Sequence, residues 1–293
     1  MEKYLQPFLP LCIVDLVLGY FGNFMIILNT NKKYSFDGKE LTLFNDYSCR
    51  PDNLVLSFRV KDNCKFLQFF SFTQGQWVDF EIINSFALKT QWRNYSFLKT
   101  KSSIYLTGGI KSKLVTNKVY RFDLINNLFT ELPPMNYARC GHCLTLLGDR
   151  IYATGGQNSK SEFNTMEYYN GNEWISVKSS RNTIGFRQSI AHKGEIYILE
   201  PNSNVFGPHG KILENKLYIE KYNPETDIWT SLKSLPCYRE YFEVISLDNC
   251  IYIMGGYGIR GKSKIIDIYN SNLDQWTHYH HDEPFYNCTL AIL

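Results

Sequence analysis

No stretch of the chain stays apolar for the roughly 18 residues that a membrane-spanning helix requires. The apolar segment from Leu9 to Phe21 is interrupted by Asp15 and Gly19, and it lacks the basic start and the small-residue cleavage site of a signal peptide. The chain also lacks a strong excess of positive or negative charge: its net charge is only +3 at pH 7. We therefore expect no membrane partner, and charge alone gives no reason to expect nucleic acid.

The eight cysteines form no closely spaced framework, and most of them lie within apolar segments. Free Cys in such places behaves as a small hydrophobic residue, so we expect a reducing, cytoplasmic location. Cys140-Gly-His-Cys143 has the letters of the disulfide isomerase active site, but it leads into an apolar strand. No helix follows to lower the pKa of the first thiol, and no second pair of ligands completes a zinc site. We interpret this tetrapeptide as structural.

One pattern dominates the chain: an apolar run, often ending in Gly-Gly, then a Tyr- or Phe-centred segment, then a further aromatic residue. It recurs six times, and the clearest copies span residues 151–174 and 251–276. A spacing of roughly 40 to 55 residues is typical of repeat folds. Within each copy the alternation of apolar and polar residues indicates half-buried strands.

The connections within each copy carry the residue types of tight hairpins, such as Asn170-Gly171-Asn172 and Asn270-Ser-Asn272. Each copy therefore predicts four antiparallel strands, here called a to d. The glycines at the end of strand b favour a place where backbones approach closely.

The two ends of the sequence predict how the sheets are joined. The chain starts almost directly with a b-like strand over residues 12–19 and ends with an a-like strand over 287–293 that has no partner of its own. If the last strand joins the first sheet, six sheets form a closed ring without exposed edges. We predict a tail over residues 1–11 and a single all-β domain over 12–293.

These features resemble the kelch-repeat β-propeller of the kelch-like, or BTB-kelch, family over nearly the whole chain. The resemblance is carried by the Gly-Gly pairs, by a Tyr seven residues before a Trp (Tyr269 and Trp276), and by Arg139-Cys-Gly-His142. It implies a six-bladed kelch propeller with four-stranded antiparallel blades, closed by the C-terminal strand.

For function, the resemblance implies a protein-recognition module. Its commonest setting is the substrate receptor of a cullin-RING ubiquitin ligase, in which a BTB domain precedes the propeller; we expect no such domain within these 293 residues. The family also includes actin-binding cytoskeletal modules and enzymes such as a copper-dependent oxidase and a sugar epimerase. We find no converging His and Tyr ligand set, so we expect no catalytic residue, cofactor or metal. His278 and His280 would share one face of a strand, which we interpret as its polar end.

The connections between strands b and c and between strands d and a share one side of a propeller. On this side Lys and Arg outnumber Asp and Glu, whereas the c–d turns on the other side carry several acidic residues. Solvated loops would explain this equally, but the functional interpretation is a basic rim that binds a short acidic segment of another protein. Nucleic acid is disfavoured because no platform of exposed aromatic residues is evident. The candidate partner-binding residues are Lys111, Lys113, Arg139, Lys160, Arg181, Phe206, His209, Lys211, Arg239, Tyr257, Arg260, Lys262 and His280.

If the basic rim binds a partner, we expect charge reversal at Arg139, Arg239 and Arg260 to abolish capture of that partner. The melting temperature should then change little, because loop side chains contribute little to stability.

Overall fold

A computed structural model of the chain shows strands as the regular secondary structure of the residues it describes. No helix among these residues is long and apolar enough to cross a membrane. The structure describes the backbone of the strands before residue 92, and then residues 92–100, 102–123, 125–126, 128–180, 188–201, 216–235, 237–258, 261–280 and 291–292.

Four consecutive sheets, numbered 3 to 6 in chain order, each have four antiparallel strands. Sheet 3 contains β9 (Ser96–Lys99), β10 (Ser103–Thr107), β13 (Val119–Asp123) and β14 (Leu128–Leu132). Sheet 4 contains β15 (Cys143–Leu147), β16 (Arg150–Thr154), β17 (Met166–Tyr169) and β18 (Trp174–Val177). Sheet 5 contains β19 (Gln188–His192), β20 (Glu195–Pro201), β21 (Leu217–Asn223) and β22 (Ile228–Ser231). Sheet 6 contains β23 (Glu240–Leu247), β24 (Cys250–Gly258), β26 (Ile265–Asn270) and β27 (Gln275–His280), with β25 (Gly261–Lys262) paired to β24.

The N-terminal sheets are less regular. Sheet 1 contains β1 (Leu11–Val14), β2 (Phe24–Ile27), β3 (Lys33–Phe36) and β4 (Leu41–Leu43), and sheet 2 contains β5 (Phe58–Lys61), β6 (Phe66–Ser71) and β7 (Gln76–Glu81). The C-terminal strand β28 (Ala291–Ile292) pairs with β1 in parallel. A small sheet joins β8 (Trp92–Arg93), β11 (Ile110–Lys111) and β12 (Leu114–Val115).

The predicted all-β class and the four-stranded antiparallel sheets are confirmed for sheets 3 to 6. Of the strand expected over residues 12–19, β1 covers Leu11–Val14, and residues 15–19 lie outside the described part of the chain.

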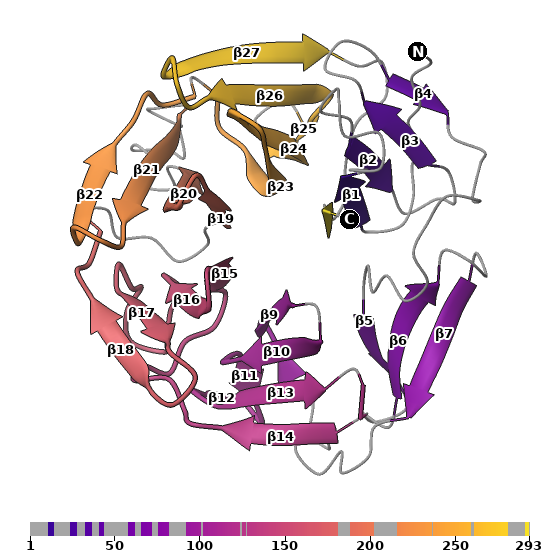
Figure 1. The fold of residues 1–293 in the computed structure, drawn as a ribbon, viewed down its shortest axis with the longest axis vertical. Coiled ribbons are helices and arrows are strands. Elements are labelled where there is room, and N and C mark those ends of the chain that lie inside the picture. Colours follow the sequence, from indigo (N-terminus) through magenta and orange to yellow (C-terminus); the bar gives the residue numbers. More distant parts are fainter. Residues whose placement is uncertain are drawn as a thin grey trace, which may run out of the picture.

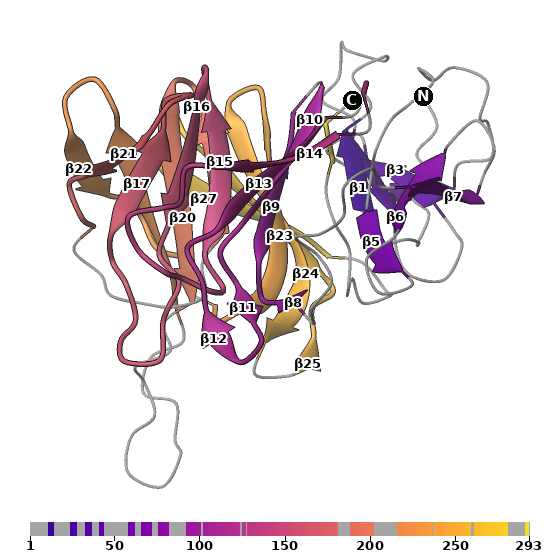
Figure 2. The ribbon, with the colours of Figure 1, turned by 90° about the horizontal axis from the view of Figure 1, so that it is seen from below.

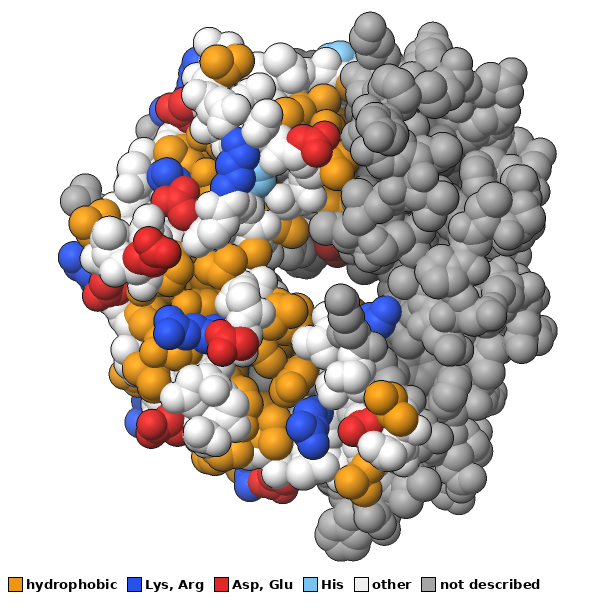
Figure 3. All heavy atoms as spheres, in the orientation of Figure 1, with side chains coloured by type: hydrophobic (Ala, Val, Ile, Leu, Met, Phe, Trp, Pro, Cys, Tyr) orange, Lys and Arg blue, Asp and Glu red, His pale blue; other side chains and the backbone are white. Residues whose placement is uncertain are grey.

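The sheets stand around a common centre, with β9, β15, β19 and β23 nearest to it and β14, β18, β22 and β27 at the perimeter (Figure 1). The b–c connections that contain β11, β12 and β25 lie on one side of the molecule (Figure 2). We call this side the b–c face. The side toward the viewer in Figures 1 and 3 is the opposite face, which carries the a–b and c–d turns.

The core lies between neighbouring sheets, because each strand alternates its side chains between the two faces of its sheet. Ile151 and Ala153 of β16 pack toward sheet 3, whereas Tyr152 of the same strand packs against Ile196 and Tyr222 of sheet 5. A third cluster joins sheets 5 and 6. Burial between sheets therefore fixes their spacing around the centre.

Two repeated hydrogen-bond patterns position the loops. Side chains at the start of the c–d turns accept two backbone N–H groups each, as Asn170 does from Asn172 and Glu173, and Asp123, Asn223 and Asn270 do likewise. These Asx turns are what the Asn-rich hairpin sequences predicted.

The second pattern joins neighbouring sheets through the tryptophans at the start of the outer strands. The indole N–H of Trp174 donates to the carbonyl of Pro133 over 3.0 Å. Trp229 and Trp276 donate in the same way to Lys178 and Lys233, over 2.8 and 2.7 Å. Each outer strand is thereby tied to the end of the outer strand before it.

A cationic hollow on the b–c face

The buried side chain of Arg139 organises the connection that enters sheet 4. Its exposed fraction is 0 %, and its guanidinium lies 2.8 Å from a carboxylate oxygen of Glu167 on β17. It also donates to the backbone carbonyls of Gly155 and Thr165, over 2.5 and 3.2 Å. Desolvation lowers the pKa of Arg139, although Glu167 opposes that shift. The arginine thus joins the start of strand a to strands b and c of its own sheet.

Sheet 6 repeats this arrangement one hundred residues later. Arg239 is 2 % exposed and lies 2.5 Å from Asp267 of β26, and it donates to the carbonyl of Ile265 over 3.1 Å. Asp267 also lies 2.5 Å from Nδ1 of His278 on β27. A buried charge needs such partners, because removing it from water without them costs several kcal/mol.

The structure corrects the sequence-based interpretation of these two arginines as exposed rim residues. Arg139 and Arg239 are buried and paired, so charge reversal at either position would place two like charges together inside a sheet. The expectation that the melting temperature stays nearly unchanged is therefore wrong for these two residues. The physical reason is that each arginine pairs with a carboxylate of strand c and donates to backbone carbonyls near strands b and c, which the sequence pattern alone does not reveal.

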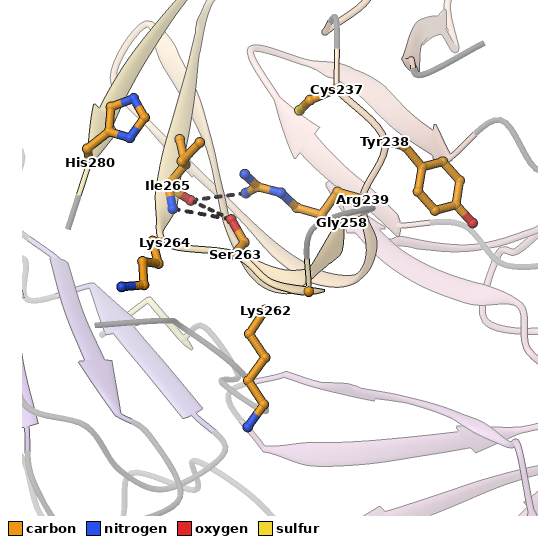
Figure 4. A pocket seen from close by; sticks show the side chains of 10 residues that line it. Cys237, Tyr238, Arg239, Gly258, Lys262, Ser263, Lys264, Ile265 and His280 are labelled. Carbon is orange, nitrogen blue, oxygen red and sulfur yellow. Dashed lines mark hydrogen bonds between the residues drawn. The ribbon is translucent and has the colours of Figure 1, made fainter. Parts of the chain in front are cut away.

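A hollow of about 600 Å³ lies on the b–c face beside Arg239 (Figure 4). Strands β24 to β27 and the connection before β23 supply its walls. Figure 4 shows Arg239 pointing toward Ser263 and Ile265. Lys262 belongs to β25, Lys264 lies between β25 and β26, and His280 ends β27. We call this pocket the cationic hollow; it is lined by Cys237, Tyr238, Arg239, Gly258, Gly261, Lys262, Ser263, Lys264, Ile265 and His280.

The structure brings together three of the candidate partner-binding residues at this hollow: Arg239, Lys262 and His280. Lys113, Lys160 and Tyr257 are exposed elsewhere on the described part of the chain, and Tyr257 directly precedes Gly258 in the hollow. Lys111 is half-buried, and its ammonium lies 5.6 Å from the centre of the Tyr120 ring. The remaining candidates lie outside the described residues: Arg181, Phe206, His209, Lys211 and Arg260.

The sequence-based selection missed Cys237, Ser263 and Lys264 as residues of a candidate site. The signal was available, because copies four and six align at an offset of one hundred residues from Arg139 and Arg239 to Asn170 and Asn270. Comparing them position by position shows that two aromatic residues of copy four are small in copy six, and that two neighbouring polar residues of copy four are lysines in copy six.

The opposite face is not simply acidic, as the charge pattern had indicated. Figure 3 shows acidic, basic and apolar side chains mixed across it. Two of its acidic turn residues have structural contacts: Asp227 accepts from the Tyr222 hydroxyl, and Asp274 accepts from the Tyr269 hydroxyl, both over 2.8 Å. Their charges therefore serve local geometry as well as surface potential.

The Cys140–Cys143 tetrapeptide is structural, as expected. Both thiols are buried and free, and burial raises the pKa of Cys140. His142 between them is also buried, with Nε2 2.6 Å from the Thr107 hydroxyl of sheet 3. Burial, with a smaller effect of the Arg139 charge, lowers the pKa of His142 well below its ordinary value of 6.5. The segment fastens sheet 4 to sheet 3.

The histidines of β27 have separate surroundings. His278 contacts Asp267, whereas His280 lines the cationic hollow. Within the described residues, no group of three or more His, Cys, Asp and Glu side chains is arranged to hold a metal ion.

Comparisons with known proteins agree with this architecture. The kelch motif family matches residues 92–136 and 138–181. Kelch-like protein 26 of Danio rerio is 25% identical over 225 residues, which is 59% of this chain and 37% of that protein. Kelch-like protein 36 of Mus musculus is 27% identical over 188 residues, or 59% of this chain and 30% of that protein. Alpha-scruin of Limulus polyphemus is 25% identical over 209 residues, or 65% and 22%.

A solved structure of YjhT has a TM-score of 0.53 and 16% identity, and the match covers 66% of each chain. This likeness concerns the fold alone. The aligned part spans well under half of the length of the named relatives. The matched motifs, the repeated Arg–carboxylate pairs and the four-stranded sheets lead to one conclusion: the chain contains kelch repeats, over residues 92–136 and 138–181, and is similar to the kelch-like proteins.

Proposed function

We propose that this chain recognises another protein through its b–c face, with the cationic hollow as the centre of the contact. The observation that carries the proposal is that Lys262, Lys264 and His280 line one concave site. This site lies beside the buried ion pair of Arg239 and Asp267. Concave sites on loops held by a rigid scaffold are where binding residues concentrate. An acidic segment of the partner would complement this charge and accelerate encounter.

We further propose that the domain works as a substrate receptor of a cullin-RING ubiquitin ligase, in an intracellular, reducing compartment. The resemblance to kelch-like proteins supports this role, and one relative is named Kelch repeat and BTB domain-containing protein 12. A complete six-bladed ring, closed by the C-terminal strand, belongs to the same proposal. The pairing of β28 with β1 supports that closure. A cytoskeletal, actin-binding role is the alternative, and an enzymatic role is not part of the proposal.

Affinity capture from lysate with matched charge variants tests the binding face. We expect Lys262→Glu/Lys264→Glu to lose the partners that the wild-type protein captures, because both lysines are exposed at the hollow. Lys178→Glu/Lys193→Glu is the control, since these two lysines are exposed but do not line the hollow. Equal capture by all three proteins would refute the proposed face.

The setting of the domain needs a separate measurement. If the ligase proposal is right, cullin and RING subunits should co-purify with the protein expressed from its natural gene. Co-sedimentation with actin filaments, without those subunits, would instead favour the cytoskeletal alternative.

A further inference from the structure

Sheets 4 and 6 share a buried Arg–carboxylate pair, but different side chains lie against the arginine in the two sheets. Arg139 and Glu167 of sheet 4 correspond to Arg239 and Asp267 of sheet 6. The b–c loops correspond as well, because the N–H of Phe163 donates to the Gly156 carbonyl over 2.8 Å and that of Ser263 donates to the Gly256 carbonyl over 2.9 Å. Positions one hundred residues apart can therefore be compared directly.

In sheet 4 two aromatic rings cover the arginine. The guanidinium carbon of Arg139 lies 5.6 Å from the ring centre of Tyr137 and 5.4 Å from that of Phe163. The two rings lie 5.9 Å apart and contact each other. At the corresponding positions sheet 6 has Cys237 and Ser263. Because an aromatic side chain fills far more space than a thiol or a hydroxyl, this replacement leaves the cationic hollow beside Arg239.

The same comparison reverses the charge of the loop. Glu162 of sheet 4 corresponds to Lys262, and Asn164 corresponds to Lys264. None of the described residues that line the cationic hollow is acidic. Asp267 pairs with Arg239, so the excess positive charge at the hollow comes from the two lysines. Ser263 lies at the same wall, where its hydroxyl contacts the backbone N–H and carbonyl of Ile265.

Resting on the proposed function, we propose that the cationic hollow binds a phosphate monoester carried by the partner, such as a phosphorylated serine. A phosphate dianion offers three strong acceptor oxygens, and the residues that line the hollow include two lysines and one histidine. A carboxylate has two oxygens and a single charge, so it uses fewer of these donors. The phosphate is the ligand that matches the number and charge of the groups present.

The hairpin has one further feature that bears on anion binding. Residues 256–263 have the glycine, lysine and serine spacing of a nucleotide phosphate loop. Such a loop needs a helix N-terminus, whereas here β25 pairs back onto β24 and β26 follows. The lysine side chains, and not a helix dipole, would hold the anion.

The test uses the full chain and two small probes, N-acetyl-phosphoserine methylamide and N-acetyl-glutamate methylamide, in ligand-observed NMR titrations at fixed ionic strength. We expect the phosphoserine probe to bind at least tenfold more tightly than the glutamate probe. Lys262→Glu/Lys264→Glu should weaken phosphoserine binding at least tenfold, and Lys178→Glu/Lys193→Glu should leave it unchanged. Absent binding, equal binding of the two probes, or an equal loss in the control variant would overturn the proposal.

A second variant rebuilds the closed arrangement of sheet 4. Cys237→Tyr/Ser263→Phe should fill the hollow with two rings and abolish phosphoserine binding without removing any positive charge. Circular dichroism melting checks that the variant folds, and the lysine variants decide the question if it does not. Persistent binding with a filled hollow would show that surface lysines alone attract the probe, which contradicts the proposal.

Phosphatase treatment of the lysate separates this inference from the proposed function. If treated lysate still yields partners that depend on Lys262 and Lys264, the b–c face is a recognition surface but the phosphate proposal is wrong. If capture never depends on these lysines, the proposed function itself fails.

Discussion

At the scale of single residues, the most informative side chains are the two buried arginines. The Arg-x-Gly-His motif predicted the position of Arg139 within its repeat, but not the direction in which it points. Its direction is set by its contacts with two backbone carbonyls and one carboxylate, which belong to residues 16, 26 and 28 positions later in the chain. Hydrogen bonds between residues so far apart in the sequence cannot be predicted from the spacing of residues within a motif.

Substituting Arg139 by Ala should lower the free energy of unfolding by about 3–5 kcal/mol, because Glu167 then stays buried without its cation. Urea denaturation of the variant and of wild type measures the change. Lys113→Ala, at an exposed turn position, should change it by less than about 0.5 kcal/mol. A loss below about 1 kcal/mol for Arg139→Ala would contradict a structural role for this ion pair.

The buried His142 predicts a pH dependence of stability. Its pKa is depressed in the folded state, so below pH 6.5 the unfolded chain takes up a proton that the folded chain refuses. This residue should therefore destabilise the protein progressively as the pH falls from about 7 toward 5. Because other groups titrate in the same range, the measurement compares wild type with His142→Asn across that interval. The variant should lose less stability on acidification; parallel curves would argue against the buried neutral imidazole.

Gly108 and Gly148 form a matched pair for backbone strain. Both have positive φ values, but a Cβ on Gly108 would lie 2.3 Å from the Arg139 carbonyl oxygen, whereas one on Gly148 would meet nothing within 4 Å. Gly148→Ala should cost about 1 kcal/mol, from the left-handed conformation alone. Gly108→Ala should cost about 3 kcal/mol, because the sheet-to-sheet contact must also open. Thermal denaturation distinguishes them, and equal costs would exclude the close approach.

At the scale of strands and turns, the sequence was informative about local chemistry. The Asn-rich hairpins predicted the Asx turns, because those contacts span only two or three residues. The tryptophans predicted the starts of the outer strands, but their hydrogen bonds to residues 41 to 51 positions earlier could not be inferred from spacing. Copy five has Leu199-Glu200-Pro201 where copies three, four and six have Gly-Gly, and its strand β20 continues through Glu200 to Pro201 in pairing with β21.

The tryptophan contacts predict a modest, separable contribution to stability. Trp174→Phe keeps most of the packing against Tyr169 but removes the donor to Pro133, which should cost about 1 kcal/mol. Trp174→Ala removes the packing as well and should cost about 3–5 kcal/mol. Chemical denaturation measures both variants. A Phe variant as unstable as the Ala variant would show that the hydrogen bond, and not the ring, dominates this contact.

At the scale of the whole molecule, periodicity predicted the sheet architecture well because burial between sheets imposes the same pattern on every copy. The candidate site was predicted less well. Charge counting selected the b–c face, but it included Arg139, which is buried in an ion pair. It did not select Cys237 and Ser263, whose small side chains leave the hollow open. A hollow is a property of several side chains at once, so it emerges only when the repeats are superposed.

The charge of the b–c face predicts a salt dependence of partner association. Raising the ionic strength from about 0.05 to 0.3 M shortens the screening distance, so the association rate should fall severalfold while the dissociation rate changes less. Stopped-flow or surface-based kinetics with a captured partner measures both rates. The control variant Lys178→Glu/Lys193→Glu should show the same salt effect as the wild-type protein. An association rate that ignores salt would contradict electrostatic recognition.

The ion pair below the cationic hollow supports the fold whether or not rings cover it, as Arg139 in sheet 4 and Arg239 in sheet 6 illustrate within one polypeptide. The residues of the ion pair therefore stabilise the sheet, whereas the residues at positions 237 and 263 determine what the hollow can bind. The ion pair forms with aromatic residues at these positions in sheet 4 and with small residues in sheet 6. A library randomised at positions 237 and 263 should therefore yield folded proteins that differ in ligand specificity.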